Sequence, residues 1–292
     1  MRELITSKSI VRVGGAFDAM SAKLVEISGF DAVWAGSFAI SATYGLPDAS
    51  ILTMTEFLNV TSNMNEACKI PIIADCDTGF GGPSNVGHMV KKYEKAGIAA
   101  ISIEDKIFPK QNSLLETGIH ELLPEKDFVA KIIAAKNAKQ DPNFMIIARV
   151  EALIANLGMD EAIKRAKAYE MAGADAIIIH SKKNTPDEIF EFTEKWNGKI
   201  PLVVIPTSYG TVTMDELIEH KIKFVIFANH SLRASHFAIS KVLDEIIQST
   251  SLSNVTTPVS SMEDIFKLQK MYDVKTQEIE IEEKLKKLGY ID

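Results

Sequence analysis

Residues 99–113 read Ala-Ala-Ile-Ser-Ile-Glu-Asp-Lys-Ile-Phe-Pro-Lys-Gln-Asn-Ser, an apolar run that turns into a charged segment at Glu104. The apolar run Ala99–Ile103 has the length and composition of a buried strand. On its own, the charged segment Glu104–Ser113 is typical of a solvated loop. In parallel β/α proteins, however, the residues directly after each strand carry the chemistry. The stretch therefore predicts a strand of a parallel sheet whose carboxyl end faces a functional site.

A second acidic segment follows another apolar run. Asp75 and Asp77 come directly after Ile70–Ala74 and precede the glycine-rich loop Gly79–Gly82. Two strand ends would thus offer carboxylate oxygens to one ion, and Mg²⁺ prefers such ligands. Acidic residues after a strand can instead cap the next helix. Because the glycine-rich loop separates Asp77 from that helix, we favour a metal site over a cap.

Short apolar runs alternate with longer amphipathic stretches along the chain, a pattern typical of repeated β/α units. Gly29, Gly97 and Gly173 each end a helical stretch before such a run, as expected for tight connections at the amino ends of the strands. Eight runs predict a closed (β/α)8 barrel of the TIM type, with residues 1–292 as one domain. The expected strands are Val11–Gly14, Ala32–Ala35, Ile70–Ala74, Ala99–Ile103, Phe144–Ala148, Ala176–Ile179, Leu202–Ile205 and Phe224–Phe227.

The composition limits the function classes. Hydrophobic residues make up 46% of the 292 residues, enough for a large core. A net charge of -7 argues against a nucleic-acid partner, which requires clustered basic side chains. We find no apolar segment that fits a signal peptide or a membrane span. Because Cys68 and Cys76 are too few for a disulfide framework, we expect a reduced, cytoplasmic location.

The C-terminal part differs from the preceding β/α units. Ser249–Ser261 is rich in Ser, Thr and Asn and is expected to form a loop. Residues from about Met262 to Leu288 have helical spacing, so we expect residues 262–292 to form a helical extension of the barrel domain. An amphipathic helix with no remaining part of its own barrel to cover can pack on another subunit.

The motifs E-D-K-x-F-P-K-x-N-S at Glu104–Ser113 and D-x-D-T-G-F-G at Asp75–Gly81 resemble the phosphoenolpyruvate mutase branch of the isocitrate lyase superfamily. The resemblance covers nearly the whole chain, from about Ala16 to the C-terminal helices. It implies a small-molecule substrate, phosphoenolpyruvate or phosphonopyruvate, and Mg²⁺ as cofactor. It also implies a homo-oligomer, a dimer of dimers, that exchanges C-terminal helices between subunits. Further matching segments are Ala148–Ile154, Ala172–Ala176, His180–Lys183 and Ala228–Ala234.

The reaction of this branch moves a phosphoryl group between the enol oxygen and the methylene carbon of pyruvate. It needs a metal for the enolate, cations for the phosphoryl group and a site without water. We expect Asp75 to be the direct Mg²⁺ ligand. Asp77 and Glu104 are then placed to hold metal-bound waters.

Two strand ends are expected to hold the phosphoryl group. Arg149 ends an apolar strand, where an unpaired charge is costly, and it can grip an anion with two hydrogen bonds. Arg149 can instead form a salt bridge with Glu151, because the two side chains point to the same side of an extended strand. A lone histidine is more often a core residue, but His180 also ends a strand and matches the family at a ligand position.

On the expected gating loop, the resemblance implies that Lys110 supplies a positive charge to the site and that Asn112 covers the phosphoryl group. It also implies that Ser113 contacts the substrate. Hydrolases of the branch carry threonine where this chain has Asn112. Trp34, Gly36, Ser37 and Phe38 follow the second strand and are expected to bind substrate. The N–H groups of Ser37 and Phe38 can hold its carboxylate, whereas mutases more commonly place the hydroxyl one position earlier.

Asp48 matches the carboxylate that receives or guides the phosphoryl group. From the residues alone, an aspartate in a turn is more simply a cap of the helix near Leu52. The segment Pro47–Leu52 also departs from the mutase pattern R-D-x-N-E-A-S and is closer to phosphonopyruvate hydrolase. The lid residue Asn112 favours the mutase, so the two segments conflict.

These residues bear on four possible functions. A phosphoenolpyruvate mutase, which forms the carbon–phosphorus bond in phosphonate biosynthesis, is favoured. The alternative is phosphonopyruvate hydrolase, which gives pyruvate and phosphate. A carbon–carbon lyase acting on a 2-oxo or 2-hydroxy acid would need a K-K-C-G-H motif, whose place is taken by Lys110–Leu114. A barrel that only binds or assembles predicts the loss of the strand-end carboxylates, which are intact.

Overall fold

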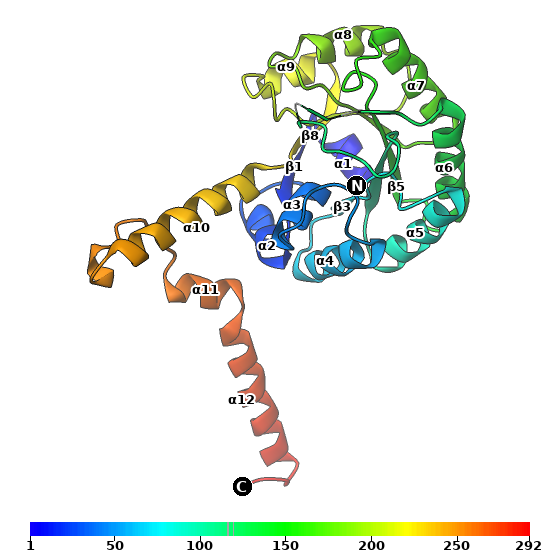
Figure 1. Cartoon of the computed structure of the whole chain (residues 1–292). Helices are drawn as coiled ribbons and strands as arrows, with labels where there is room; N and C mark the ends of the chain where they lie inside the picture. Colours follow the sequence, from blue (N-terminus) through cyan, green and yellow to red (C-terminus); the bar gives the residue numbers. More distant parts are fainter. Residues whose placement is uncertain (116, 119) are drawn as a thin grey trace. The chain divides into compact units, whose positions relative to one another are not determined.

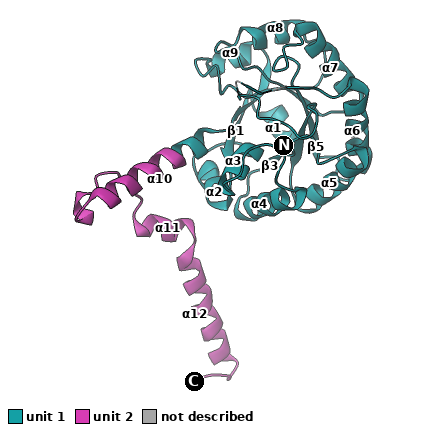
Figure 2. Cartoon of the chain, viewed as in Figure 1, with its two compact units in different colours: residues 1–234 teal, residues 235–292 magenta. Residues whose placement is uncertain are grey.

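The structure is a computed structural model that describes residues 1–115, 117–118 and 120–292. It forms two compact units, residues 1–234 and 235–292 (Figure 2). The expected C-terminal extension at 262–292 lies within the second unit, which begins earlier, at Ser235.

The first unit is a closed barrel of eight parallel strands in sequence order, surrounded by helices (Figure 1). The predicted (β/α)8 fold is confirmed, and each predicted strand is present with its ends shifted by at most two residues. The strands are β1 (Val11–Ala16), β2 (Ala32–Ala35), β3 (Ile72–Asp75), β4 (Ala100–Glu104), β5 (Met145–Val150), β6 (Ala176–Ile179), β7 (Leu202–Val204) and β8 (Ile222–Phe227).

Capping residues define where several helices begin. Thr53 accepts a hydrogen bond from the N–H of Glu56, whose carboxylate binds the N–H of Thr53, and this capping box starts α4. Gly97 and Gly173 have positive φ values of 80° and 101° just after α5 and α7, as a left-handed helix end requires. The helices are α1 (Arg2–Ser7), α2 (Ala19–Ile27), α3 (Ser37–Thr43), α4 (Met54–Ala67), α5 (Pro83–Lys95), α6 (Glu125–Ala138), α7 (Met159–Met171), α8 (Asp187–Lys195), α9 (Met214–Glu219) and α10 (His230–Gln248).

The core has two layers. One apolar cluster fills the barrel interior and includes Val13, Ile73 and Ile147. A larger cluster packs the outer face of the strands against the helices. The strand register places Glu104 of β4 directly beside Arg149 of β5. Because the carboxyl ends of parallel strands meet at one end of the barrel, the polar residues after them converge there.

The second unit contains the rest of α10, a short 3-10 helix at Leu252–Asn254, α11 (Met262–Leu268) and α12 (Met271–Lys287). The expected helical extension from Met262 consists of α11 and α12, with Lys270 at a positive φ of 57° between them. All residues from 235 to 292 are described, and none is buried. Within the described chain, no helix combines the length and apolar character that a membrane crossing requires.

Candidate active site

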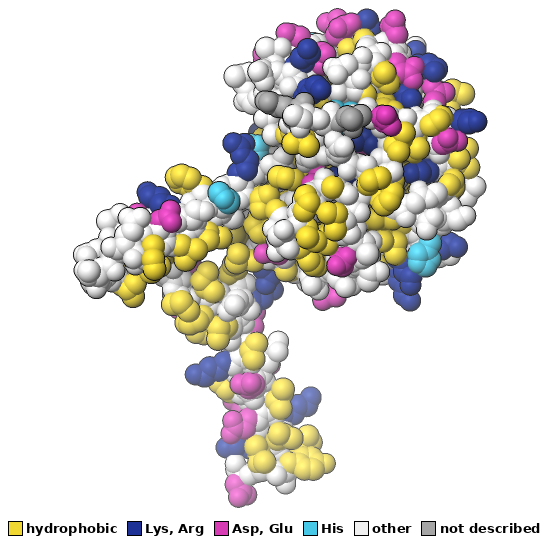
Figure 3. Space-filling view, in the orientation of Figure 1, with side chains coloured by type: hydrophobic (Ala, Val, Ile, Leu, Met, Phe, Trp, Pro, Cys, Tyr) yellow, Lys and Arg dark blue, Asp and Glu magenta, His cyan; other side chains and the backbone are white. Residues whose placement is uncertain are grey.

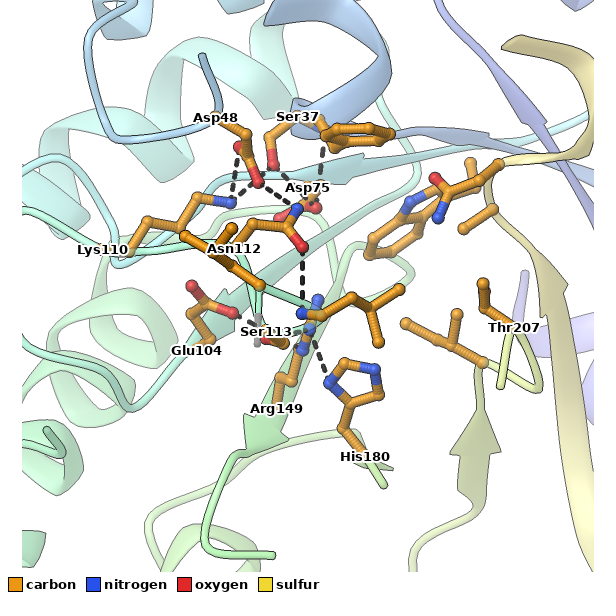
Figure 4. A pocket seen from close by; sticks show the side chains of 18 of the residues that line it. Ser37, Asp48, Asp75, Glu104, Lys110, Asn112, Ser113, Arg149, His180 and Thr207 are labelled. Carbon is orange, nitrogen blue, oxygen red and sulfur yellow. Dashed lines mark hydrogen bonds and ion pairs between the residues drawn. The ribbon is translucent and has the colours of Figure 1, made fainter. Parts of the chain in front are cut away.

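A cavity of about 450 Å³ opens at the carboxyl ends of the strands. Every site residue predicted from the sequence lines it except Asp77 (Figure 4). Asp77 has a positive φ of 50°, so the backbone turns directly after β3 and breaks the alternation that would place Asp77 beside Asp75. The lining residues are Trp34, Gly36, Ser37, Phe38, Asp48, Asp75, Glu104, Lys110, Asn112, Ser113, Leu114, Leu115, Arg149, His180, Ile205, Thr207, Ala228, Asn229 and Arg233.

The acidic residues gather where β3 and β4 end. Oδ2 of Asp75 accepts a hydrogen bond from Oγ of Ser37 at 3.0 Å, and Oδ1 accepts one from the N–H of Asp77 at 3.2 Å. Burial raises the pKa of Asp75 and raises that of Asp77 to about 7. Oε1 of Glu104 is buried without a hydrogen-bond partner among the described residues. This cluster of carboxylates would be stabilised by a cation.

The ammonium of Lys110 reaches this cluster from the expected gating loop. Its Nζ lies 2.8 Å from Oδ1 of Asp77 and 2.9 Å from Oδ1 of Asp48, and it donates to Oγ of Ser37 at 3.0 Å. Burial alone would lower the pKa of Lys110, but the carboxylates around it hold that pKa well above its usual value. The backbone N–H of Lys110 also donates to Oγ of Ser50 at 3.1 Å.

Asp48 is held by the same loop. Nδ2 of Asn112 donates to its Oδ2 at 2.8 Å, opposite the Lys110 contact (Figure 4). Burial would raise the pKa of Asp48, but Lys110 and Asn112 lower it. The alternative role as a helix cap is not observed, since Thr53 caps α4. Asp48 is therefore a carboxylate inside the cavity that is ionised and has two polar partners.

A second cluster is formed by Arg149 near the end of β5, Glu151 directly after β5 and His180 directly after β6. Nε of Arg149 forms an ion pair with Oε1 of Glu151, and its Nη2 lies 2.8 Å from Nδ1 of His180. Nδ1 of His180 is also 2.9 Å from Oε1 of Glu151. Burial and the neighbouring Arg149 lower the pKa of His180. The Glu151 ion pair weighed as an alternative for Arg149 is thus present, while Arg149 still lines the cavity.

Ser113 joins this cluster to the loop. Its Oγ donates to Oε2 of Glu151 at 2.7 Å, and it accepts from Nζ of Lys106 at 2.5 Å and Nη2 of Arg149 at 3.1 Å. Lys106 is only 2% exposed, and its Nζ is 3.3 Å from Oε2 of Glu151. No role for Lys106 is expected from the sequence. Its spacing of two residues from Glu104 is the signal that could have indicated an inward side chain.

The residues after β2 form another part of the wall. Gly36 precedes α3, and a Cβ there would lie 2.9 Å from Nε1 of Trp34, so a larger residue would disturb the indole. Ser37 begins α3, and its N–H lies 3.4 Å from Oδ2 of Asp75. Phe38 is 38% exposed at the cavity. The N–H groups expected to hold a carboxylate therefore begin a helix beside the acidic cluster.

A barrel that gathers carboxylates, a lysine, an arginine and a histidine in one cavity has the construction of an enzyme for a small anionic substrate. The family model for phosphoenolpyruvate phosphomutase matches residues 1–247, and the chain belongs to this family of enzymes. The fold of this chain is shared with a crystal structure of 2,3-dimethylmalate lyase, at 24% identity and a TM-score of 0.84.

Both phosphoenolpyruvate phosphomutases and phosphonopyruvate hydrolases are similar to this chain. The crystal structure of phosphoenolpyruvate phosphomutase from Streptomyces platensis subsp. rosaceus has 44% identity and a TM-score of 0.93, covering 96% of this chain and 97% of that one. Phosphonopyruvate hydrolase from Variovorax sp. (strain Pal2) is 43% identical over 270 residues, 92% of this chain and 93% of that protein. A crystal structure of phosphonopyruvate hydrolase with oxalate and Mg²⁺ has 41% identity and a TM-score of 0.89, covering 95% and 96%.

Proposed function

We propose that the enzyme is a phosphoenolpyruvate mutase that interconverts phosphoenolpyruvate and phosphonopyruvate. The observation that carries this proposal is the pair of loop contacts to Asp48, from Lys110 at 2.9 Å and from Asn112 at 2.8 Å. Through these contacts, Lys110 and Asn112 of the loop meet the carboxylate expected to receive the phosphoryl group. A mutase must keep water from a phosphoryl group in transit, and a closed loop with polar contacts serves that purpose.

The acidic cluster fits a divalent ion, which membership in the family implies and which we propose to be Mg²⁺. Asp75 would bind it directly, and Asp77 and Glu104 would hold its waters. The buried, unpartnered Oε1 of Glu104 supports this assignment. Among the described residues, no three acidic, histidine or cysteine side chains are grouped so that they could hold a metal ion by themselves. When bound, Mg²⁺ would stabilise the negative charge of the pyruvate enolate.

The chain's own residues then account for the transfer. Arg149 and His180 bind the phosphoryl oxygens, and the N–H groups of Ser37 and Phe38 orient the substrate carboxylate. The oxygen–phosphorus bond of the enol breaks, Asp48 receives or guides the phosphoryl group, and a carbon–phosphorus bond forms at the methylene carbon. Arg149 remains charged throughout because Glu151 and Glu104 raise its pKa against the effect of burial.

Phosphonopyruvate hydrolase is the second candidate, and the segment Pro47–Ser50 favours it because it is closer to the hydrolase pattern. Overall identity does not separate the two activities, since the Variovorax hydrolase is 43% identical to this chain and the Streptomyces phosphomutase is 44% identical. In that reaction, Asp48 would attack the phosphorus atom, and the carbon–phosphorus bond would break to leave the pyruvate enolate, which takes up a proton to give pyruvate. Water would then open the acyl phosphate on Asp48 to release phosphate. We place the mutase first because Asn112 occupies the lid position where hydrolases carry threonine.

The two candidates are separated by the products of purified enzyme given phosphonopyruvate and Mg²⁺. ³¹P NMR should show conversion to phosphoenolpyruvate with little free phosphate. If the enzyme forms chiefly pyruvate and phosphate, it is the hydrolase. If it consumes no phosphonopyruvate, both assignments fail.

We also propose that the enzyme works in the cytoplasm as a dimer of dimers that exchanges C-terminal helices, within phosphonate biosynthesis. Residues 235–292 expose apolar side chains such as Phe237 (69%), Ile247 (84%) and Tyr290 (76%). Hydrophobic side chains are visible along this unit in Figure 3. Exposed apolar surface of this kind marks a protein interface. Light scattering that gave a monomer in solution would contradict the proposal.

A further inference from the structure

Asp105 follows Glu104 and is fully buried, yet it does not line the cavity. Successive residues of an extended chain point to opposite sides, so Asp105 faces the helices outside the sheet. There its Oδ2 accepts hydrogen bonds from the hydroxyl of Tyr169 at 2.6 Å and from Nη1 of Arg165 at 3.1 Å. Arg165 and Tyr169 lie four residues apart on α7 and share one face of that helix.

The other oxygen of Asp105 leads back to the cavity. Oδ1 accepts a hydrogen bond from the backbone N–H of Glu151 at 2.9 Å. The buried carboxylate of Glu151 contacts Arg149, His180 and Ser113. All three of these side chains line the cavity. Asp105 thus fixes the backbone of the residue that orients two phosphoryl-binding groups and one lid residue.

We infer that Asp105 is a positioning residue for the proposed reaction, held in place by Arg165 and Tyr169 of α7. It acts through Glu151 on Arg149 and His180, and the inference rests on the proposed function. A buried ion pair such as Asp105–Arg165 is costly to desolvate and is weak evidence for stabilisation alone. A purely structural pair would tie α7 to the barrel without affecting the rate of the folded enzyme, so the two roles make different predictions.

Tyr169→Phe tests the inference by removing one hydroxyl from Asp105, and Tyr209→Phe is its matched control. Tyr209 is also fully buried, and its hydroxyl has no hydrogen-bond partner among the described residues. The assay follows the consumption of phosphonopyruvate, whichever product forms. Misplacing a catalytic group by 1 Å costs on the order of 100-fold, and Arg165 still holds Asp105, so kcat should fall about five- to ten-fold in Tyr169→Phe. KM should stay within about two-fold, and Tyr209→Phe should match the parent.

A double-mutant cycle tests the route through Glu151. If Tyr169 acts through Glu151, Tyr169→Phe should cost nothing further in a Glu151→Gln background. Additive losses would overturn this route. A lower Tm with kcat unchanged in Tyr169→Phe would show that the contacts of Asp105 with Arg165 and Tyr169 serve stability only. If Glu151→Gln fails to fold, Arg165→Lys, which keeps one donor for Asp105, should retain more activity than Arg165→Met, and equal losses would count against the inference.

A measurement without substrate separates this inference from the proposed function. The ring nitrogen signals of His180, one of six histidines, can be assigned in ¹⁵N NMR spectra by comparison with His180→Gln. In the ligand-free enzyme, they should shift in Tyr169→Phe and remain in place in Tyr209→Phe. Unchanged signals in both variants would refute the positioning route, even for an enzyme active on phosphonopyruvate. Shifted signals in an enzyme that leaves phosphonopyruvate intact would refute the proposed function alone.

Discussion

Asn112→Ala is the most informative single change, because it removes the lid's neutral contact to Asp48 and leaves the Lys110 ion pair. The lost hydrogen bond spans 2.8 Å and ends on an ionised carboxylate. Bonds to charged groups contribute about 1.5–3 kcal/mol. Since about 1.4 kcal/mol corresponds to a ten-fold change in rate, we expect isomerisation to slow on the order of 10- to 100-fold. Free phosphate should also increase, because water reaches the phosphoryl group.

The assay for this variant is ³¹P NMR with phosphonopyruvate and Mg²⁺, which reports the rate and the two products in one spectrum. Ile107→Ala is the control, since Ile107 lies on the same segment and does not line the cavity. Asn112→Thr introduces the residue that the family resemblance assigns to the hydrolases, and it should shift the products toward phosphate. A variant that keeps the parent's rate and product ratio would refute the shielding role of Asn112.

Asp75→Ala should lower kcat by several orders of magnitude, because Mg²⁺ would carry most of the enolate charge; full activity after chelation and Mg²⁺ readdition would be incompatible with Asp75 as the ligand. Arg149→Ala should lower both kcat and affinity, because a contact to moving charge is strongest in the transition state; a rise in KM alone would assign Arg149 to uniform binding. Thr213→Ala should cost about 1 kcal/mol in urea unfolding without changing activity, because Thr213 caps α9 through the N–H of Glu216; unaltered stability would show that this cap contributes nothing.

The barrel was predictable because strand length, glycine positions and strand-end polarity repeat along the chain. The positions of Asp75, Glu104, Arg149 and His180 at one cavity follow from the rule that parallel strands end together. Those four side chains require no knowledge of the loops. Their placement relative to one another follows from the strand order.

Partners across loops could not be predicted in this way. Ser113 was expected to contact substrate, and its hydroxyl is in addition shared by Glu151, Lys106 and Arg149. The position of a loop hydroxyl depends on how the chain returns to the barrel, and sequence spacing does not contain that information. Asp77 shows the same limit, since a single positive φ turns it out of the cavity lining.

The pairing of Glu104 beside Arg149 in adjacent strands has a consequence for folding. Side chains alternate along a strand, so a slip of one residue between β4 and β5 would turn one of these charges into the helix layer. The two halves of the cavity are therefore aligned by backbone hydrogen bonds. Activity regained during refolding therefore requires the native alignment of β4 and β5, whereas helical signal can return without it.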